Sequence, residues 1–117
     1  MILTQSGVIL FTENYAACVK FYSDQVGLPI VQQKDTLTKF EFGGAYLMVE
    51  MGGPKSAVQK ARSENPTVLR FDVSDVAVAT AKLNRSGIEV AVSSFVWGTI
   101  GVFYDLDGNR CELKNAV

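Results

Sequence analysis

The sequence contains no histidine among its 117 residues. Imidazole is the side chain that most often activates a serine or cysteine nucleophile near neutral pH. Neither Ser93 nor Ser94, nor either cysteine, can therefore form a nucleophile–histidine–acid triad, and hydrolysis of that type is excluded. Any general acid–base chemistry is left to residues such as Glu50, Tyr104 and Glu112.

An excess of charge is also lacking. Lys and Arg number 11, Asp and Glu number 12, the net charge is −1, and the basic residues form no run. Because a nucleic-acid surface needs clustered Lys and Arg, we expect no nucleic-acid partner. No apolar run approaches a membrane span, and the N-terminus lacks the pattern of a signal peptide. We therefore expect no membrane association and a cytoplasmic location.

Cysteine is scarce, with only Cys18 and Cys111, one in a predicted helix and one in a predicted strand. Such cysteines are usually buried small hydrophobic residues of a reducing compartment. A chain of this length buries roughly two-thirds of its unfolded surface, which is enough for a core without disulfides. With 48% apolar residues, the sequence predicts one globular domain.

Hydrophobic periodicity predicts the same series of elements twice. The first half predicts a strand over 8–12, a helix over 15–25 and strands over 28–33, 37–42 and 45–51. The second half predicts a strand over 67–73, a helix capped by Ser74 or Asp75, and strands over 88–92, 99–104 and 110–114. The segment 93–98, with Phe95 and Trp97, is predicted as a loop.

The two halves form an internal repeat. Gly27 and Gly87 each end a predicted helix, stand 60 residues apart, and are followed by the similar segments LPIV and IEVA. Each half therefore follows the order βαβββ. The sequence predicts an α+β fold of two βαβββ modules, at about residues 1–52 and 66–117, joined by a linker over 53–65.

The last stretch, Val102–Lys114, predicts a hairpin. Asp107-Gly108 is a strong turn signal, because glycine adopts a positive φ without steric cost. Beyond it, alternation places Arg110, Glu112 and Lys114 on one face of the strand, with Cys111 and Leu113 on the other.

This hairpin resembles the C-terminal signature of the vicinal oxygen chelate superfamily, which contains glyoxalases, bleomycin-resistance proteins and extradiol dioxygenases. The family pattern, aromatic-x-Asp-Pro-Asp-Gly-Asn-x-x-Glu-Leu, stands here as Phe103 to Leu113, with Leu106 in place of proline. The helix end Phe21-Tyr22 to Gly27-Leu28 matches a second family pattern. The resemblance implies sheets that curl into an open cup with the helices outside, and a homodimer.

In metal-using members of the superfamily, His, Glu or Gln from four strands bind a divalent ion on the cup floor. The corresponding positions here are Gly7, Met48, Val68 and Glu112, of which only Glu112 can be a ligand. Glu50 could add a second carboxylate, but two carboxylates suit only a weak Mg²⁺ site and not Zn²⁺, Ni²⁺ or Fe²⁺. We expect no metal and no cofactor, and hence none of the metal-dependent activities.

We expect alternate strand residues to line an apolar, aromatic-rich cup that binds a small molecule. The alternative is that the same residues fill a core. The predicted ligand-binding residues are Phe40, Phe42, Tyr46, Met48, Glu50, Arg70, Trp97, Val102, Tyr104 and Glu112.

Two of these residues keep alternative roles. Arg70 and Glu112 are predicted on paired strands, so Arg70 either forms a structural ion pair with Glu112 or grips an acidic group of the ligand. Trp97 either covers the cup and stacks on a planar ligand or lies in a dimer contact.

The predicted function is metal-independent binding of a small, partly aromatic molecule, as in bleomycin-resistance-type proteins. The alternative is a glyoxalase-like lyase or isomerase, related to lactoylglutathione lyase, with altered chemistry and Glu112 as its catalytic acid or base. A third possibility, a structural or partner-binding dimer, predicts a cup filled by its own side chains.

Overall fold

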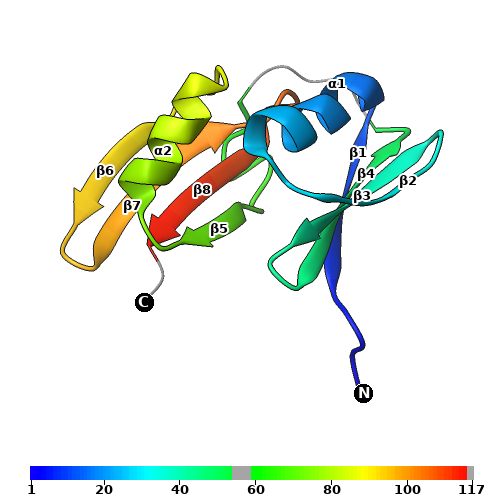
Figure 1. Cartoon of the computed structure of the whole chain (residues 1–117), viewed down its shortest axis with the longest axis horizontal. Helices are drawn as coiled ribbons and strands as arrows, with labels where there is room; N and C mark the ends of the chain where they lie inside the picture. Colours follow the sequence, from blue (N-terminus) through cyan, green and yellow to red (C-terminus); the bar gives the residue numbers. More distant parts are fainter. Residues whose placement is uncertain (54–58, 116–117) are drawn as a thin grey trace. The chain divides into compact units, whose positions relative to one another are not determined.

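The computed structural model describes residues 1–53 and 59–115, and the chain divides into two units, Met1–Lys55 and Ser56–Val117. Each unit has the order strand, helix and three strands (Figure 1). The predicted α+β fold of two βαβββ modules is confirmed. The division between the units falls inside the predicted linker 53–65, of which residues 54–58 lie outside the described part of the chain.

The first unit is a mixed four-stranded sheet in the order β1-β4-β3-β2. β1 runs parallel to β4, and the other neighbours are antiparallel. Its elements are β1 (Gly7–Thr12), α1 (Tyr15–Lys20), the π-helix η1 (Phe21–Val26), β2 (Ile30–Gln33), β3 (Leu37–Phe42) and β4 (Ala45–Met51).

The second unit repeats this topology in the order β5-β8-β7-β6, again with one parallel pair, β5 and β8. The helix α2 packs on β7 and β8 (Figure 1). Its elements are β5 (Leu69–Val73), α2 (Val76–Arg85), β6 (Ala91–Phe95), β7 (Gly98–Tyr104) and β8 (Arg110–Asn115).

Each sheet has a helix face, which packs against the helix of its own unit, and an open face on the other side. On the helix face of the first unit, Leu47 and Val49 of β4 and Phe40 of β3 are fully buried. On that of the second, Leu69, Phe103 and Leu113 are buried. Each unit therefore has its own apolar core between helix and sheet. Both cysteines are buried, as predicted.

The predicted helix ends are confirmed at both glycines. Gly27 and Gly87 have φ angles of 87° and 92°, which side-chain-bearing residues rarely adopt. At the start of α2, the Asp75 carboxylate accepts a hydrogen bond from the Val78 N–H at 3.1 Å, so Asp75 is the N-cap.

The first helix differs from the prediction of one continuous helix over 15–25. It is α-helical to Lys20 and continues as the π-helix η1. The Tyr22 carbonyl accepts hydrogen bonds from the N–H groups of both Gly27 and Leu28. Phe21 and Tyr22 are both buried in this wider segment, with their rings edge to face at 5.1 Å. Apolar spacing predicts burial but cannot distinguish these hydrogen-bond patterns.

The strand predicted over 88–92 is displaced: β6 begins at Ala91 and ends at Phe95. The Ile88 N–H donates to the Leu83 carbonyl at 3.0 Å, so the residue after Gly87 still closes the end of α2. Ile88 is buried there and cannot start the strand. Phe95, predicted in a loop, is consequently the last residue of a strand.

The prediction that Phe40 and Phe42 line the same face as Tyr46 and Met48 is wrong. In the register of β3 and β4, Phe40 pairs with Leu47 and Phe42 with Ala45, while Lys39 and Glu41 pair with Met48 and Tyr46. Directly paired residues share a face of the sheet, so both phenylalanines lie on the helix face. The ring of Phe40 is fully buried, 6.2 Å from that of Tyr22.

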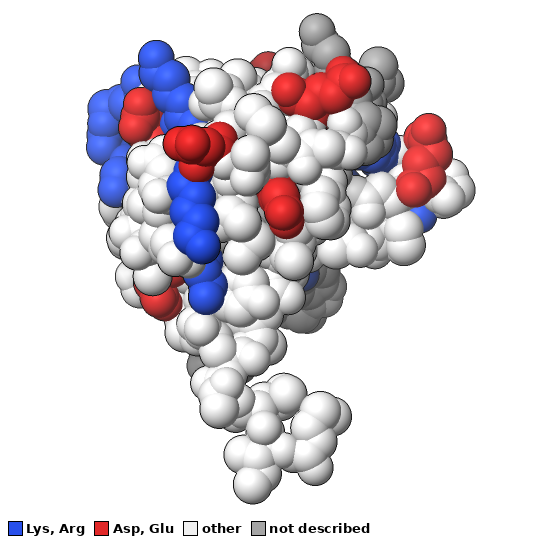
Figure 2. All heavy atoms as spheres, turned by 90° about the vertical axis from the view of Figure 1, so that its right-hand side faces the viewer, with Lys and Arg blue, Asp and Glu red and all other residues white. Residues whose placement is uncertain are grey.

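No helix among the described residues is long and apolar enough to cross a membrane. Figure 2 shows one side of the molecule, where acidic and basic side chains lie among uncharged areas and neither sign dominates. This agrees with the nearly balanced charge of the sequence.

Candidate ligand pocket of the second unit

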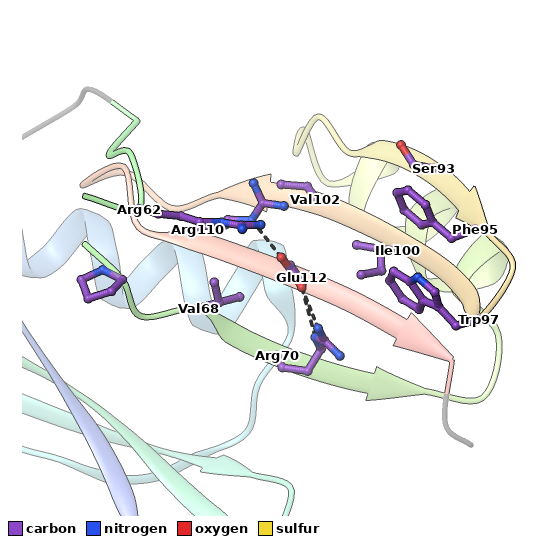
Figure 3. A pocket seen from close by; sticks show the side chains of 11 residues that line it. Arg62, Val68, Arg70, Ser93, Phe95, Trp97, Ile100, Val102, Arg110 and Glu112 are labelled. Carbon is purple, nitrogen blue, oxygen red and sulfur yellow. Dashed lines mark hydrogen bonds and ion pairs between the residues drawn. The ribbon is translucent and has the colours of Figure 1, made fainter. Parts of the chain in front are cut away.

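A pocket of about 540 Å³ lies on the open face of the second sheet (Figure 3). Pockets for small organic ligands are typically roughly 300–1,000 Å³ in volume. All residues that line it belong to the second unit. They are Arg62, Pro66, Val68, Arg70, Ser93, Phe95, Trp97, Ile100, Val102, Arg110 and Glu112.

Strand alternation brings most of these side chains together. Every second residue of a strand points to the same face, and the strand register sets which of them are neighbours. Glu112 of the inner strand β8 pairs with Arg70 of β5 on one side and with Val102 of β7 on the other. The intervening residues, such as Cys111 and Leu113, fill the core on the helix face.

Glu112 is held between two arginines. Its Oε1 accepts hydrogen bonds from Arg70 Nε at 3.2 Å and Nη2 at 2.8 Å, and its Oε2 accepts one from Arg110 Nε at 2.9 Å. The Glu112 side chain is 7% exposed, against 42% for Arg70 and 27% for Arg110. The carboxylate side chain is therefore buried, whereas the two arginine side chains that bind it are partly exposed.

These contacts shift the ionisation of the group. Burial by itself raises the pKa of Glu112, but the hydrogen bonds and positive charges of Arg110 and Arg70 outweigh it, so the pKa lies below the ordinary 4.5. For Arg110, burial opposes the charged form, yet Glu112, and to a smaller extent Tyr104, raise its pKa. Glu112 is thus ionised at neutral pH, and two arginines around one carboxylate leave the cluster with a net positive charge.

Two aromatic side chains line the pocket where β6 turns into β7. Phe95 and Trp97 stack in parallel, with ring centroids 4.9 Å apart and an interplanar angle of 3°. They remain 53% and 59% exposed. Large flat rings that stack on each other while exposed offer a further planar surface to a ligand.

The chain before β5 adds Arg62. The Lys60 N–H donates to the Gly108 carbonyl at 3.1 Å, and the side chains of Lys60 and Asn65 both donate to Asn109 Oδ1. These bonds hold residues 60–65 against the β7–β8 turn, so this part of the predicted linker belongs structurally to the second unit. Arg62 is thereby placed at the pocket.

The cluster around Glu112 does not fit a divalent metal. Both carboxylate oxygens already accept hydrogen bonds from guanidinium groups, whose positive charge would repel a cation. The chain has no histidine to replace them. Within residues 1–53 and 59–115, no group of three or more potential metal-ligating His, Cys, Asp or Glu side chains lies close together.

Four of the predicted site residues meet in this pocket: Arg70, Trp97, Val102 and Glu112. Tyr104 pairs with Arg110 in the β7–β8 register and so shares the open face, although it does not line the pocket. Of the two alternatives for Arg70, the ion pair with Glu112 is present, and a ligand contact stays a prediction because the Arg70 side chain is partly exposed.

The other predicted residues lie in the first unit. Tyr46, Met48 and Glu50 alternate along β4 on its open face. The Tyr46 ring lies over the backbone of Gly7, where a larger residue would collide with it, and Lys39 Nζ lies 4.3 Å from its centroid. A binding role for these three residues stays a prediction.

Seven of the eleven lining residues are absent from the predicted ligand-binding residues, and Arg62, Pro66 and Ser93 are among them. Arg62 and Pro66 precede β5 in a polar stretch without periodicity, so no pattern indicated their direction. Ser93 lies in the segment 93–98 that the sequence predicts as a loop. Its alternation with Phe95 was the available signal, since residues two apart in a strand share a face.

Comparisons with known proteins agree with this description. The chain matches solved structures of a glyoxalase/bleomycin resistance protein/dioxygenase from Nocardioides (16% identity, TM-score 0.77, covering 100% of this chain and 85% of that one). It also matches lactoylglutathione lyase from Agrobacterium tumefaciens (18%, 0.74, covering 99% and 96%). A third match is the fosfomycin resistance protein FosX from Listeria monocytogenes (19%, 0.71, covering 97% and 90%). At these identities the likeness concerns the fold alone.

Comparison with curated protein sequences finds no match. The family model for the Glyoxalase/Bleomycin resistance protein/Dioxygenase superfamily matches residues 4–113, which is nearly the whole chain. With the two βαβββ units and the C-terminal hairpin in place, the chain belongs to the glyoxalase/bleomycin resistance protein/dioxygenase superfamily.

Proposed function

We propose that this protein binds a small, partly aromatic molecule in the pocket of the second unit, without a metal ion, in the manner of bleomycin-resistance-type proteins. The observation that carries the proposal is the lining: one pocket of ligand size combines a stacked aromatic pair, aliphatic side chains and arginines. Small-molecule sites typically combine such apolar walls with a few polar groups.

Independence of metal is supported by the state of Glu112. The Glu112 carboxylate accepts hydrogen bonds from two guanidinium groups, so both of its oxygens already have positively charged partners. FosX is described with Mn(II) bound, so metal use occurs among structural relatives. In this chain both oxygens of Glu112 accept hydrogen bonds from arginines, which supports binding without a metal.

Binding is also favoured over the lyase or isomerase alternative. A general base at neutral pH works best with a pKa near the working pH. The pKa of Glu112 is lowered below 4.5 by the two arginines, which makes the carboxylate a weak base. Glu112, the catalytic acid or base that the enzyme alternative names, is therefore better suited to holding the arginines in place.

As an oligomer, we propose the homodimer that is usual for single-domain members of the family. Light scattering coupled to size-exclusion chromatography tests this independently of the ligand. A mass of about twice the 12.7 kDa of the chain is the expected result, and a mass equal to the chain would contradict it.

The binding proposal is tested with a series of naphthalene compounds that share a four-carbon chain and differ in the end group: carboxylate, phosphate, alcohol or amine. Each is added to the purified protein in EDTA, with bleomycin as a further ligand. Because a ligand that binds only the folded state raises Tm, at least one should give a concentration-dependent rise. Trp97 is the only tryptophan, so its fluorescence should change in the same titration.

Two results would contradict the proposal. One is that no compound raises Tm or changes the Trp97 fluorescence. The other is a rise in Tm that occurs only after a divalent metal is added back, since ligand binding would then depend on the metal.

A further inference from the structure

The pocket concentrates positive charge in a protein that has none in excess. The chain contains four arginines, and three of them, Arg62, Arg70 and Arg110, line this one pocket. Glu112 is the single acidic residue among the lining side chains. The lining thus carries two more positive than negative charges, whereas the whole chain has a net charge of −1.

Glu112 does not bind every N–H group of Arg70 and Arg110. Arg70 contributes Nε and Nη2 to the pair, and Arg110 contributes Nε, so Nη1 of Arg70 and both Nη atoms of Arg110 take no part in binding Glu112. A guanidinium carries five N–H donors in a rigid fork that suits oxygen anions. Glu112 fixes the two forks in position, the Arg110 side chain also interacts with Tyr104, and both arginines line the pocket.

The charge and the aromatic rings lie at different ends of the pocket. Figure 3 shows Arg62 and Arg110 at one end, Glu112 and Arg70 in the middle, and Phe95 and Trp97 at the other end. The register agrees, because Arg110 pairs with Tyr104 at the end of β7, whereas Phe95 pairs with Gly98 at its start. With a rise of about 3.3 Å per strand residue, these ends are about 20 Å apart along the backbone.

We infer that the natural ligand is an elongated anion, with an acidic oxygen group held by Arg62, Arg70 and Arg110 and a planar ring stacked on Phe95 and Trp97. The inference rests on the proposed function, since it uses the same pocket. A cationic ligand would face the guanidinium groups with no free carboxylate, because both Glu112 oxygens are already bound. Ile100 and Val102 provide an apolar surface between the two ends.

The naphthalene series tests this by isothermal titration calorimetry in EDTA. Hydrogen bonds to charged groups are worth enough to change affinity roughly ten- to a hundredfold. The carboxylate and the phosphate should therefore bind at least tenfold more tightly than the alcohol, and the amine should bind most weakly. If only one of the two anions shows the preference, it identifies the acidic group that the pocket accepts.

The same series separates the inference from the proposed function. If the alcohol, the amine and the anions bind equally well, the anion inference is wrong and the binding pocket remains. If none of them binds, the proposed function fails with it.

A pair of variants tests whether the effect is local. Arg62→Gln removes a pocket charge from an exposed side chain, and should weaken the carboxylate about tenfold while leaving the alcohol unchanged. Arg85→Gln is the matched control, because it removes the same charge from the last turn of α2, outside the pocket lining. Equal losses of carboxylate affinity in both variants, or no loss in Arg62→Gln, would contradict the proposed binding of the acidic group by Arg62.

Discussion

The open faces of the two sheets carry different chemistry on the same framework. In both units the last strand of the module lies between a parallel and an antiparallel neighbour, and its register with them is equivalent. The first unit has uncharged side chains at three positions where the second has a complete ion cluster. The equivalent residues are Met48 and Glu112, Ile9 and Arg70, and Tyr46 and Arg110.

This difference shows that a βαβββ module of this chain folds without charge at those positions. A buried carboxylate with two guanidinium partners also gives little net stability compared with apolar side chains of similar size. Folding alone therefore does not explain why Arg70, Arg110 and Glu112 stand together in the second unit. The proposed anionic ligand, which needs the arginines, would explain it.

The helix faces, by contrast, form the apolar core in both units. Truncation of a core side chain there should therefore have the largest effect on stability. Phe40 in the first unit is fully buried against Tyr22, so Phe40→Ala should lower the free energy of unfolding by about 3–5 kcal/mol. Denaturant unfolding followed by circular dichroism measures this.

Phe95→Ala is the control, because Phe95 belongs to the open face and is half exposed. Phe95→Ala should lower the free energy of unfolding by less than about 1 kcal/mol. Similar losses in the two variants would mean that the assignment of Phe40 to the core is wrong.

The second prediction concerns the ion cluster. Glu112→Met alone gives this position the residue found in the first unit but leaves Arg70 and Arg110 facing each other without a carboxylate. It should destabilise the protein by about 2 kcal/mol. Replacing all three residues by their first-unit equivalents, Arg70→Ile, Arg110→Tyr and Glu112→Met together, should bring the stability to within about 1 kcal/mol of the original.

Urea unfolding of the single and triple variants checks this. If the triple variant is at least as unstable as Glu112→Met, the cluster is needed for folding. The uncharged residues of the first unit then cannot replace it in the second.

The smallest expected effect is on pH dependence. The pKa of Glu112 is lower in the folded protein than the ordinary 4.5, so its ionisation stabilises the fold above that value. This stabilisation is lost as the pH falls below about 4.5 and through the lowered pKa, because the carboxyl group must then take up a proton. Unfolding measured between pH 7 and pH 3 should therefore be less pH-dependent in the triple variant. An identical pH dependence would mean that Glu112 is not coupled to the arginines.

The fold was predictable because its signals are local and repeated. Gly27 and Gly87 end helices by their own backbone freedom, and the alternation around Glu112 correctly placed Arg110 and Cys111 on opposite faces. The register of β3 was not predictable in this way. Apolar residues stand at Leu37, Phe40 and Phe42, so alternation alone does not decide which face is the core.

The pocket was only partly predictable for a similar reason. Residues on regular strands, such as Arg70 and Val102, followed from alternation. Arg62 is placed by hydrogen bonds from Lys60 and Asn65 to Asn109, more than 40 residues further along the chain. Such long-range contacts of a polar segment leave no periodic trace in a single sequence.

The most direct test of the account is a comparison of ligand binding in the original protein and in the triple variant Arg70→Ile, Arg110→Tyr, Glu112→Met. Titration calorimetry in EDTA with the naphthalene carboxylate is the measurement, and circular dichroism establishes that both proteins are folded. The account predicts a folded variant that binds the carboxylate at least a hundredfold more weakly. Undiminished binding by the folded variant would contradict it, because the cluster would then have no part in recognising the ligand.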